Sequence, residues 1–247
     1  MSNRVIRSRP LRLKVWGDNA CFTRPEMKVE RFSYDVMTPS AARGILEAIL
    51  WKPAIRWRVT QIDVLKPIRF GSLRHDKNIN NEEVDFKPIR WESVRRNEVG
   101  AVMSTDLAIS AMGRRSGQLG IYVEEQRQQR AGLFLRDVAY TIHAYFELTD
   151  KAGPEDTTIK FQEMFLRRAE KGQCFHRPYL GCREFSAYFE PVPHDQPLPE
   201  PISISCDLGW MLYDQDYEEE KPIPRFFRAS LKNGCMIPDF DSQGVRS

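Results

Sequence analysis

Apolar and polar side chains alternate along several stretches of the chain, with the period of two that is typical of a strand with one buried face. The first stretch covers residues 11–16, where three apolar residues alternate with basic and aromatic ones, and residues 55–60 repeat the pattern. The alternation is strongest over residues 138–148 and returns briefly at 185–189. We therefore predict four strands, each directing one face toward a core.

In two other stretches the apolar residues recur every three or four positions, as on the buried side of an amphipathic helix. For the first helix, Thr38 is the expected N-cap, Pro39 the first helical residue and Pro53 the stop. Its predicted buried side consists of Ala42, Ile45, Leu46 and Ile49. Gly44 lies inside this helix, where glycine costs about 1 kcal/mol relative to alanine, so we expect close packing there.

The second helix is expected between residues 153 and 172. Residues 153–156 (Gly-Pro-Glu-Asp) supply a chain breaker, a first-turn proline and acidic residues at its start. Gly172 can adopt the left-handed conformation that ends a helix. The predicted buried side consists of Phe161, Met164, Phe165 and Ala169.

In chain order the prediction is strand, helix, strand, a long irregular segment, strand, helix and strand. We assign this α+β pattern to a ferredoxin-like (RRM-like) core over residues 1–190, with a functional insertion or arm at about residues 68–131. A proline-dense link then leads into residues 191–247, which we predict to form a small β-rich carboxyl-terminal domain and tail. The sheet of such a core leaves one face free for single-stranded RNA.

The composition is that of an ordinary globular protein, with 41% hydrophobic and 29% charged residues among 247 and a net charge of +3. No apolar run approaches the roughly 20 residues of a membrane span, and the basic amino terminus lacks an apolar signal segment. We therefore expect a cytoplasmic protein without a membrane partner. The five cysteines are odd in number and form no C-x-x-C pair, so we expect no disulfide framework, no zinc site and no cofactor.

Positive charge is concentrated in residues 160–183, which we call the cationic segment. Six Lys or Arg residues against two Glu give it a net charge of +4 (6 − 2), which exceeds the +3 of the whole chain. A cationic helix end that continues into a basic loop with a glycine can hold a polyanion. The alternative interpretation is a solvated helix face followed by a turn.

The chain also contains the motifs RLKVWGDNACFTRPEMKVERFSYDVMTPSAARGILEAILWKPAIRW, VRRNEV, RQQRA, HAYFELTDKAG, FLRRAEKGQ, YLGCREF and DLGWML. Together these motifs resemble CRISPR-associated Cas-five proteins of the type I-C (Dvulg) subtype over nearly the whole chain. The resemblance implies a RAMP protein with a ferredoxin-like RNA-binding core, a long hairpin arm and a small carboxyl-terminal β domain. It also implies an endoribonuclease that cuts the precursor CRISPR RNA within each repeat, without metal.

The same resemblance implies partners. After cleavage the protein is expected to stay on the 5′ handle of the mature CRISPR RNA, as a subunit of a type I-C interference (Cascade-like) complex in antiviral defence. Its neighbours there are the backbone and large subunits, and the target DNA is an indirect partner.

Metal-independent RNA cleavage uses the ribose 2′-OH as nucleophile and leaves a 2′,3′-cyclic phosphate, which requires a base, a cation and an acid. By resemblance, family members that cleave carry a Lys-His pair at the start of the second helix and a Tyr or His before the Trp-Lys-Pro motif at residues 51–53. Lys160 matches the lysine, whereas Phe161 and Leu50 occupy the other two positions. Two interpretations stay open: cleavage by Lys160 with groups from elsewhere, or a non-catalytic structural subunit that binds the 5′ handle.

Lys160 is the candidate to neutralise the scissile phosphate. His143, on the polar face of its strand, and His176, in the basic loop, are candidates for the acid and the base, because an imidazole titrates near neutral pH. Tyr34 is a further candidate proton carrier, with a buried core tyrosine as the alternative. The predicted RNA-contact residues, expected to meet mainly phosphate, are Arg24, Lys28, Arg95, Arg96, Arg127, Arg130, Arg167, Arg168, Arg177 and Arg183. The candidates to stack on bases, with core packing as the alternative, are Trp16, Phe22 and Tyr145.

Overall fold

The computed structural model of the protein describes residues 6–27, 31–71, 76–77, 83–84, 91–93, 128–130, 132–216 and 223–238. Within these ranges the helices are α1 (Pro39–Ile49) and α4 (Thr158–Glu170). The strands of the main sheet are β1 (Leu11–Ala20), β2 (Arg31–Phe32), β3 (Ile55–Val64), β4 (Phe70–Gly71), β9 (Gly132–Leu148), β10 (Tyr188–Pro191) and β13 (Cys235–Met236). The remaining strands form antiparallel pairs: β5 (Asp76–Lys77) with β6 (Glu83–Val84), β7 (Trp91–Ser93) with β8 (Gln128–Arg130), and β11 (Cys206–Asp216) with β12 (Ile223–Leu231).

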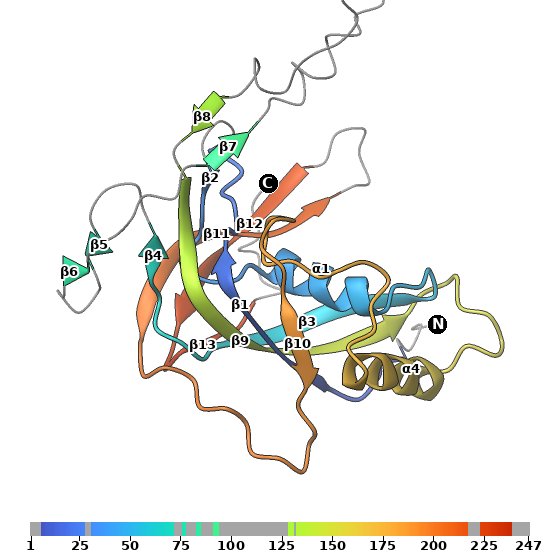
Figure 1. The fold of residues 1–247 in the computed structure, drawn as a ribbon. Coiled ribbons are helices and arrows are strands. Elements are labelled where there is room, and N and C mark those ends of the chain that lie inside the picture. The colour runs from blue at the N-terminus through green and yellow to red at the C-terminus, as the bar shows by residue number, and fades with distance from the viewer. Residues whose placement is uncertain are drawn as a thin grey trace, which may run out of the picture.

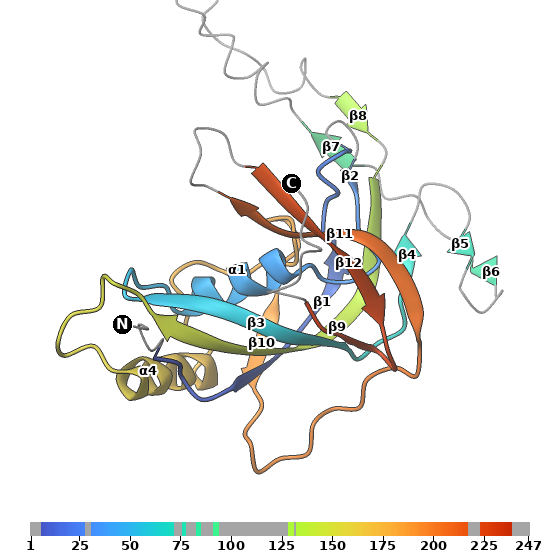
Figure 2. The same cartoon turned by 180° about the vertical axis from the view of Figure 1, so that it is seen from behind.

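The main sheet has the strand order β10-β1-β9-β3-β13, and neighbouring strands along this path are antiparallel. β1 and β3 therefore run parallel to each other, with α1 between them in the chain, and β9 and β10 run parallel with α4 between them. Figures 1 and 2 show β9 as the long, curved centre of this arrangement. The structure thus confirms the predicted α+β class, with a mostly antiparallel sheet and few helices.

α1 confirms the prediction for the first helix. Thr38 caps it by accepting a hydrogen bond from the Ala41 N–H at 3.3 Å, and Pro39 is its first residue. All four residues of the predicted buried side are buried. The close packing expected at Gly44 is wrong, because nothing lies within 4 Å of the place that a Cβ would take. Gly44 instead lines a pocket of about 310 Å³ beside the helix.

α4 begins later than predicted. Its N-cap is Thr157, whose hydroxyl accepts a hydrogen bond from the Lys160 N–H at 3.2 Å. Residues 153–156 form a turn before the helix, closed by a hydrogen bond from the Gly153 N–H to the Asp156 carboxylate. A threonine hydroxyl satisfies a free amide of the first turn, which Pro154 cannot do. Gly172 ends the helix with a φ of 63°, as predicted.

β9 starts six residues before the alternation becomes visible in the sequence, at Gly132 instead of Val138. The reason lies at Asp137, which has a φ of 50° and is exposed together with Arg136. Two consecutive exposed polar residues interrupt the period of two without ending the strand. At the other end of the fold, β10 begins at Tyr188, because residues before it form a turn in which Leu180 N–H binds the Phe185 carbonyl at 2.7 Å.

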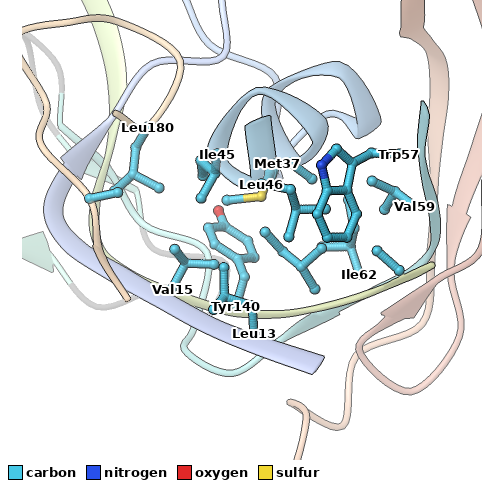
Figure 3. Packing of buried hydrophobic residues seen from close by; sticks show 14 of the residues in the cluster. Leu13, Val15, Met37, Ile45, Leu46, Trp57, Val59, Ile62, Tyr140 and Leu180 are labelled. Carbon is cyan, nitrogen blue, oxygen red and sulfur yellow. The ribbon is translucent and has the colours of Figure 1, made fainter. Parts of the chain in front are cut away.

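The core lies between one face of the sheet and the two helices. Figure 3 shows Leu13 of β1, Tyr140 of β9 and Trp57 of β3 around Ile45 and Leu46 of α1, and all five are buried. Every second residue of β9 from Val138 to Phe146 is buried in this core, as the alternation predicted. The sequence pattern therefore assigned the inner face of the sheet correctly.

The opposite face of the sheet carries polar side chains. Arg12, His143 and Gln61 are register partners on β1, β9 and β3, so they share this face. Lys14 lies two residues further along β1 and forms an ion pair of 2.7 Å with Glu190 of β10. The two faces of β9 thus separate the apolar core from a polar surface.

The carboxyl-terminal strands share the core with the main sheet. Arg43 of α1 binds the Asp214 carboxylate of β11 through two hydrogen bonds of 2.8 and 3.1 Å. Met211 and Phe227 of the β11–β12 hairpin are buried among the core residues, and β13 pairs with the edge of β3. The described residues therefore show no separate core for residues 191–247. Most of the predicted insertion at about 68–131 lies outside the described residues.

Candidate functional site

Lys160 lies in the first turn of α4, where its side chain is 46% exposed. Its ammonium group forms an ion pair with Asp156 Oδ1 at 3.1 Å. The Gly153 N–H and Lys160 hold the pKa of Asp156 below its ordinary value, with a smaller contribution from the charge of Lys52. Asp156 thus orients the ammonium group of Lys160. Because the pair is open to solvent, a phosphate group can replace Asp156 as the partner of this ammonium group.

The two positions at which the chain departs from the expected catalytic pattern are both in the core. Phe161 is 3% exposed and packs edge to face against Phe146, with ring centroids 6.4 Å apart. Leu50 is fully buried, and its backbone N–H continues the last turn of α1 to Leu46. Neither position carries a group that can transfer a proton.

His143 forms an ion pair or hydrogen bond with Asp63 Oδ2 at 2.7 Å, and Gln61 donates to the other oxygen of Asp63 at 2.7 Å. Burial raises the pKa of Asp63, but the hydrogen bonds from His143 and Gln61 outweigh it and leave the pKa below its ordinary value. His143 lies on the polar face of the sheet, whereas Phe161 packs α4 against the core face. The sheet therefore separates His143 from Lys160.

His176 lies in the loop after α4, exposed, with its ring 6.1 Å from Phe175 and 6.5 Å from Tyr179. This loop runs back along α1, since the Phe175 N–H binds the Ala48 carbonyl at 2.8 Å. Lys160 is in the first turn of α4 and His176 follows its last turn, so about 15 Å of helix lies between them. The structure brings neither histidine next to Lys160.

Tyr34 is fully buried in the core. Burial, together with the charge of Glu26, raises the pKa of Tyr34 to about 12. The guanidinium of Arg24 lies 4.6 Å from the ring centroid. A buried phenol that resists deprotonation does not reach an RNA backbone, so the core alternative applies and Tyr34 is not part of the site.

The predicted RNA-contact arginines fall into different environments. Arg167 and Arg183 are exposed, and Arg177 is exposed with its guanidinium 6.0 Å from the ring centroid of Tyr188. Arg168 instead donates a hydrogen bond of 2.9 Å to the Ile49 carbonyl and so ties α4 to α1. Arg24 is held near Asp35 and Glu26 at 3.6 and 4.0 Å. Lys28, Arg95, Arg96 and Arg127 lie outside the described residues, and Arg130 is described only as part of β8.

Of the candidate stacking residues, Trp16 lies on the polar face of the sheet and is stacked on Tyr188, with centroids 6.0 Å apart. Lys14 lies 5.1 Å from the Trp16 ring centroid. Tyr145 is covered by Arg7 at 5.2 Å. Phe22 is buried, so its role is in the core.

Sequence reasoning missed the groups that orient the candidates. Asp156 stands four residues before Lys160, a helix spacing that could have revealed the pair. Asp63 meets His143 only through the register of β3 on β9, which leaves no local signal. It also missed the large exposed aromatic residues Trp51 and Phe175.

The described residues contain no group of three or more His, Cys, Asp or Glu side chains arranged to hold a metal ion. Neither α1 nor α4 is long and apolar enough to cross a membrane.

The sequence that folds in this way matches a known protein family over most of its length. The family model described as "CRISPR-associated protein (Cas_Cas5)" matches residues 10–238, so the chain belongs to the CRISPR-associated Cas5 family. Within that family the chain is of the Cas5d, type I-C, kind. It is 50% identical, over the full length of both chains, to "CRISPR pre-crRNA endoribonuclease Cas5d" of Mannheimia succiniciproducens. A protein of the same name from Thermus thermophilus is 44% identical over 92% of this chain and 90% of its own length.

Solved structures agree on the fold. A structure titled "Crystal Structure of CRISPR-associated Protein" superposes with a TM-score of 0.66 at 20% identity, covering 99% of this chain and 100% of the other. A functionally uncharacterized protein from Streptococcus mutans gives a TM-score of 0.63 at 18% identity, with the same coverage.

Proposed function

We propose that the protein is a precursor CRISPR RNA endoribonuclease that cuts within repeats and stays on the 5′ handle as a subunit of a type I-C interference complex. The observation that carries this proposal is the 50% identity, over both full lengths, to a relative named as a CRISPR pre-crRNA endoribonuclease. The exposed Lys160, at the position where the family resemblance requires a lysine, supports it. The proposed setting is the cytoplasm, with the CRISPR RNA and the backbone and large subunits as partners and target DNA as an indirect one.

We also propose that residues 1–190 are a ferredoxin-like (RRM-like) core. The strand order β10-β1-β9-β3 supports this, because the four strands rank fourth, first, third and second along the chain. α1 and α4 each connect two parallel strands of that sheet, as in two βαβ halves.

In the proposed reaction the ribose 2′-OH attacks the adjacent phosphate in line, and the 5′-oxygen leaves with a proton. The ammonium group of Lys160 leaves its ion pair with Asp156 when the RNA binds. It then stabilises the negative charge that develops on the phosphate oxygens. Positions 50 and 161 hold buried apolar residues, so the base that accepts the 2′-OH proton and the acid that protonates the leaving 5′-oxygen come from other positions. Of the two candidate histidines, His176 is exposed and lies on the helical side of the sheet, whereas His143 lies on the opposite face.

The second candidate function is a subunit that binds the 5′ handle without cutting. The burial of Phe161 and Leu50 favours it, because two of the three expected proton-transfer or electrostatic groups are replaced by core side chains. The two functions share the RNA site and differ only in chemistry.

The test is incubation of the purified protein with its own repeat RNA in EDTA. We expect one cut with a 2′,3′-cyclic phosphate, abolished by 2′-deoxy substitution at the scissile nucleotide. Lys160→Ala should lose about 10²–10³ in single-turnover rate while its affinity changes little. Lys232→Ala, which removes an exposed lysine from the turn before β13, is the control and should cut at the parent rate.

Each outcome separates the candidates. Cleavage that requires Mg²⁺, or that survives the 2′-deoxy substitution, would refute the mechanism. Tight binding without any cut would establish the structural subunit. His176→Ala and His143→Ala, assayed in the same way, should differ, with the His176 variant losing at least about tenfold in rate.

A further inference from the structure

Two large aromatic side chains project into solvent where α1 ends. Phe175 is 87% exposed and Trp51 is 61% exposed, which makes them the most exposed aromatic side chains among the described residues. Water-exposed aromatic rings of this size are uncommon without a partner, because their burial is favourable. Their exposure therefore needs an explanation.

The backbone beneath both rings is fixed. Three consecutive carbonyls at the end of α1 accept hydrogen bonds from three different elements. Ala48 binds the Phe175 N–H at 2.8 Å, Ile49 binds Arg168 of α4 at 2.9 Å, and Leu50 binds Trp57 Nε1 of β3 at 2.9 Å. Trp51 follows Leu50 directly and Phe175 is held on Ala48, so the two rings are presented from one anchored place.

The surroundings of these rings are cationic. Lys52 follows Trp51 directly, is exposed, and is close enough to Asp156 for its charge to contribute to the lowered pKa of that carboxyl. Phe175 itself belongs to the cationic segment, which has a net charge of +4. Exposed aromatic rings among cations fit a chain with negative phosphates and flat bases that offer π-faces.

We propose that Trp51 and Phe175 are stacking positions for unpaired bases of the repeat RNA, where its strand crosses the carboxyl end of α1 toward Lys160. This inference rests on the proposed function and deepens it by naming what grips the RNA beside the lysine. When a base stacks on a fixed ring, its nucleotide is held apart from the next nucleotide of the strand. In-line attack by a 2′-OH needs such a splayed step, which a base-paired or freely stacked strand does not offer.

The charge around the rings decides between RNA and a protein partner. A hydrophobic protein surface on these rings would desolvate the charge of Lys52 without offering a phosphate to pair with it. A polyanion pairs with this charge directly. RNA is therefore the occupant that this charge favours over another subunit of the complex.

The test uses repeat RNA in which single unpaired bases are replaced by 2-aminopurine, whose fluorescence is quenched by stacking. We expect quenching at one or two positions with the parent protein, and loss of quenching at one position each in Trp51→Ala and Phe175→Ala. Each variant should bind the repeat about five- to one hundred-fold more weakly. Trp51→Phe should keep most of the affinity, because it keeps a π-face.

Two controls distinguish stacking from charge and from misfolding. The slope of log affinity against log salt should stay at the parent value in both alanine variants, whereas Lys52→Ala should flatten it by about 0.7. Trp210→Ala removes an exposed tryptophan from β11 and should bind and quench like the parent. Since both proposed rings are exposed, all variants should unfold at the parent temperature.

Parent affinity and unchanged quenching in both alanine variants would overturn the inference. If Lys160→Ala still slowed cleavage in that case, the proposed function would stand without it. Normal RNA binding combined with lost association with the other complex subunits would assign the rings to a protein interface. A parent protein that neither binds nor cuts its repeat would refute the proposed function itself.

Discussion

Replacing Phe161 by histidine restores the residue type that the family resemblance places there, yet we expect the variant to lose stability and gain no activity. Phe161 is 3% exposed and packs on Phe146, with its ring centroid 5.7 Å from the ammonium nitrogen of Lys160, so the imidazole would be enclosed in the core beneath that ammonium group. The loss of buried aromatic surface and an unpaired ring N–H together cost about 3 kcal/mol. In a domain of this size that lowers the midpoint of thermal unfolding by roughly 6–12 °C.

The pH dependence sharpens this prediction. Burial disfavours the imidazolium, so the unfolded chain binds the extra proton more readily and stability falls as pH falls. The destabilisation relative to the parent should therefore grow between about pH 8 and about pH 6. Gln162→His adds the same ring at the next, half-exposed position of α4 and should leave stability within about 0.5 kcal/mol of the parent.

The measurements are thermal unfolding followed by circular dichroism, and single-turnover cleavage of the repeat RNA in EDTA. A Phe161→His protein as stable as the parent, or one that cuts faster, would refute the reasoning. Either result would mean that this side chain can leave the core and reach the RNA. The catalytic pattern of the family would then apply to this chain after a simple exchange.

Three further perturbations test other parts of the structure. Asp63→Asn should destabilise the protein by about 2 kcal/mol at neutral pH, because it removes a buried charged acceptor of His143. The folded pKa of Asp63 lies below its unfolded value, so the stabilisation by its carboxylate is present above about pH 4 and is lost as pH falls through the folded pKa. The free energies of unfolding of parent and variant should therefore converge as the pH falls through the folded pKa. Gly44→Ala should stabilise by about 1 kcal/mol in urea unfolding, since a Cβ meets nothing within 4 Å; a destabilised variant would contradict the open space. Arg167→Ala should flatten the salt dependence of RNA binding by about 0.7 without a stability change, whereas Arg168→Ala should lower stability because it unties α4 from α1; equal behaviour of the two would contradict this division.

Local sequence signals were sufficient for elements whose structure depends on interactions between residues close in sequence. The Thr38-Pro39 start of α1 and the alternation along β9 depend on short-range chemistry, and both were predicted with the correct faces. The signal failed where competing local groups were close together. Pro154 looked like the start of a helix, but the hydroxyl of Thr157 provides the better cap.

The candidate site was less accessible to prediction, because its parts meet through tertiary packing. The sequence left two interpretations open for Tyr34, and its burial decided between them; no local signal shows that the sheet stands between His143 and Lys160. The sequence also shows no reason to single out Phe175, which looks like any core aromatic until its backbone is found on Ala48 with the ring outside. The chemistry of cleavage indicated which residue types to consider. Which of these residues lie close together depends on the register of β3 on β9 and on the course of the loop after α4.

The edge strand β13 has a consequence for synthesis of the protein. β3 has β9 on one side and the two residues of β13 on the other, and β13 comes from the last part of the described chain. A nascent chain therefore carries Ile62 and Asp63 of β3 unpaired on this side until residue 236 has left the ribosome. Unpaired edges recruit other strands, so truncation before Cys235 should promote aggregation even though no RNA-binding residue is lost.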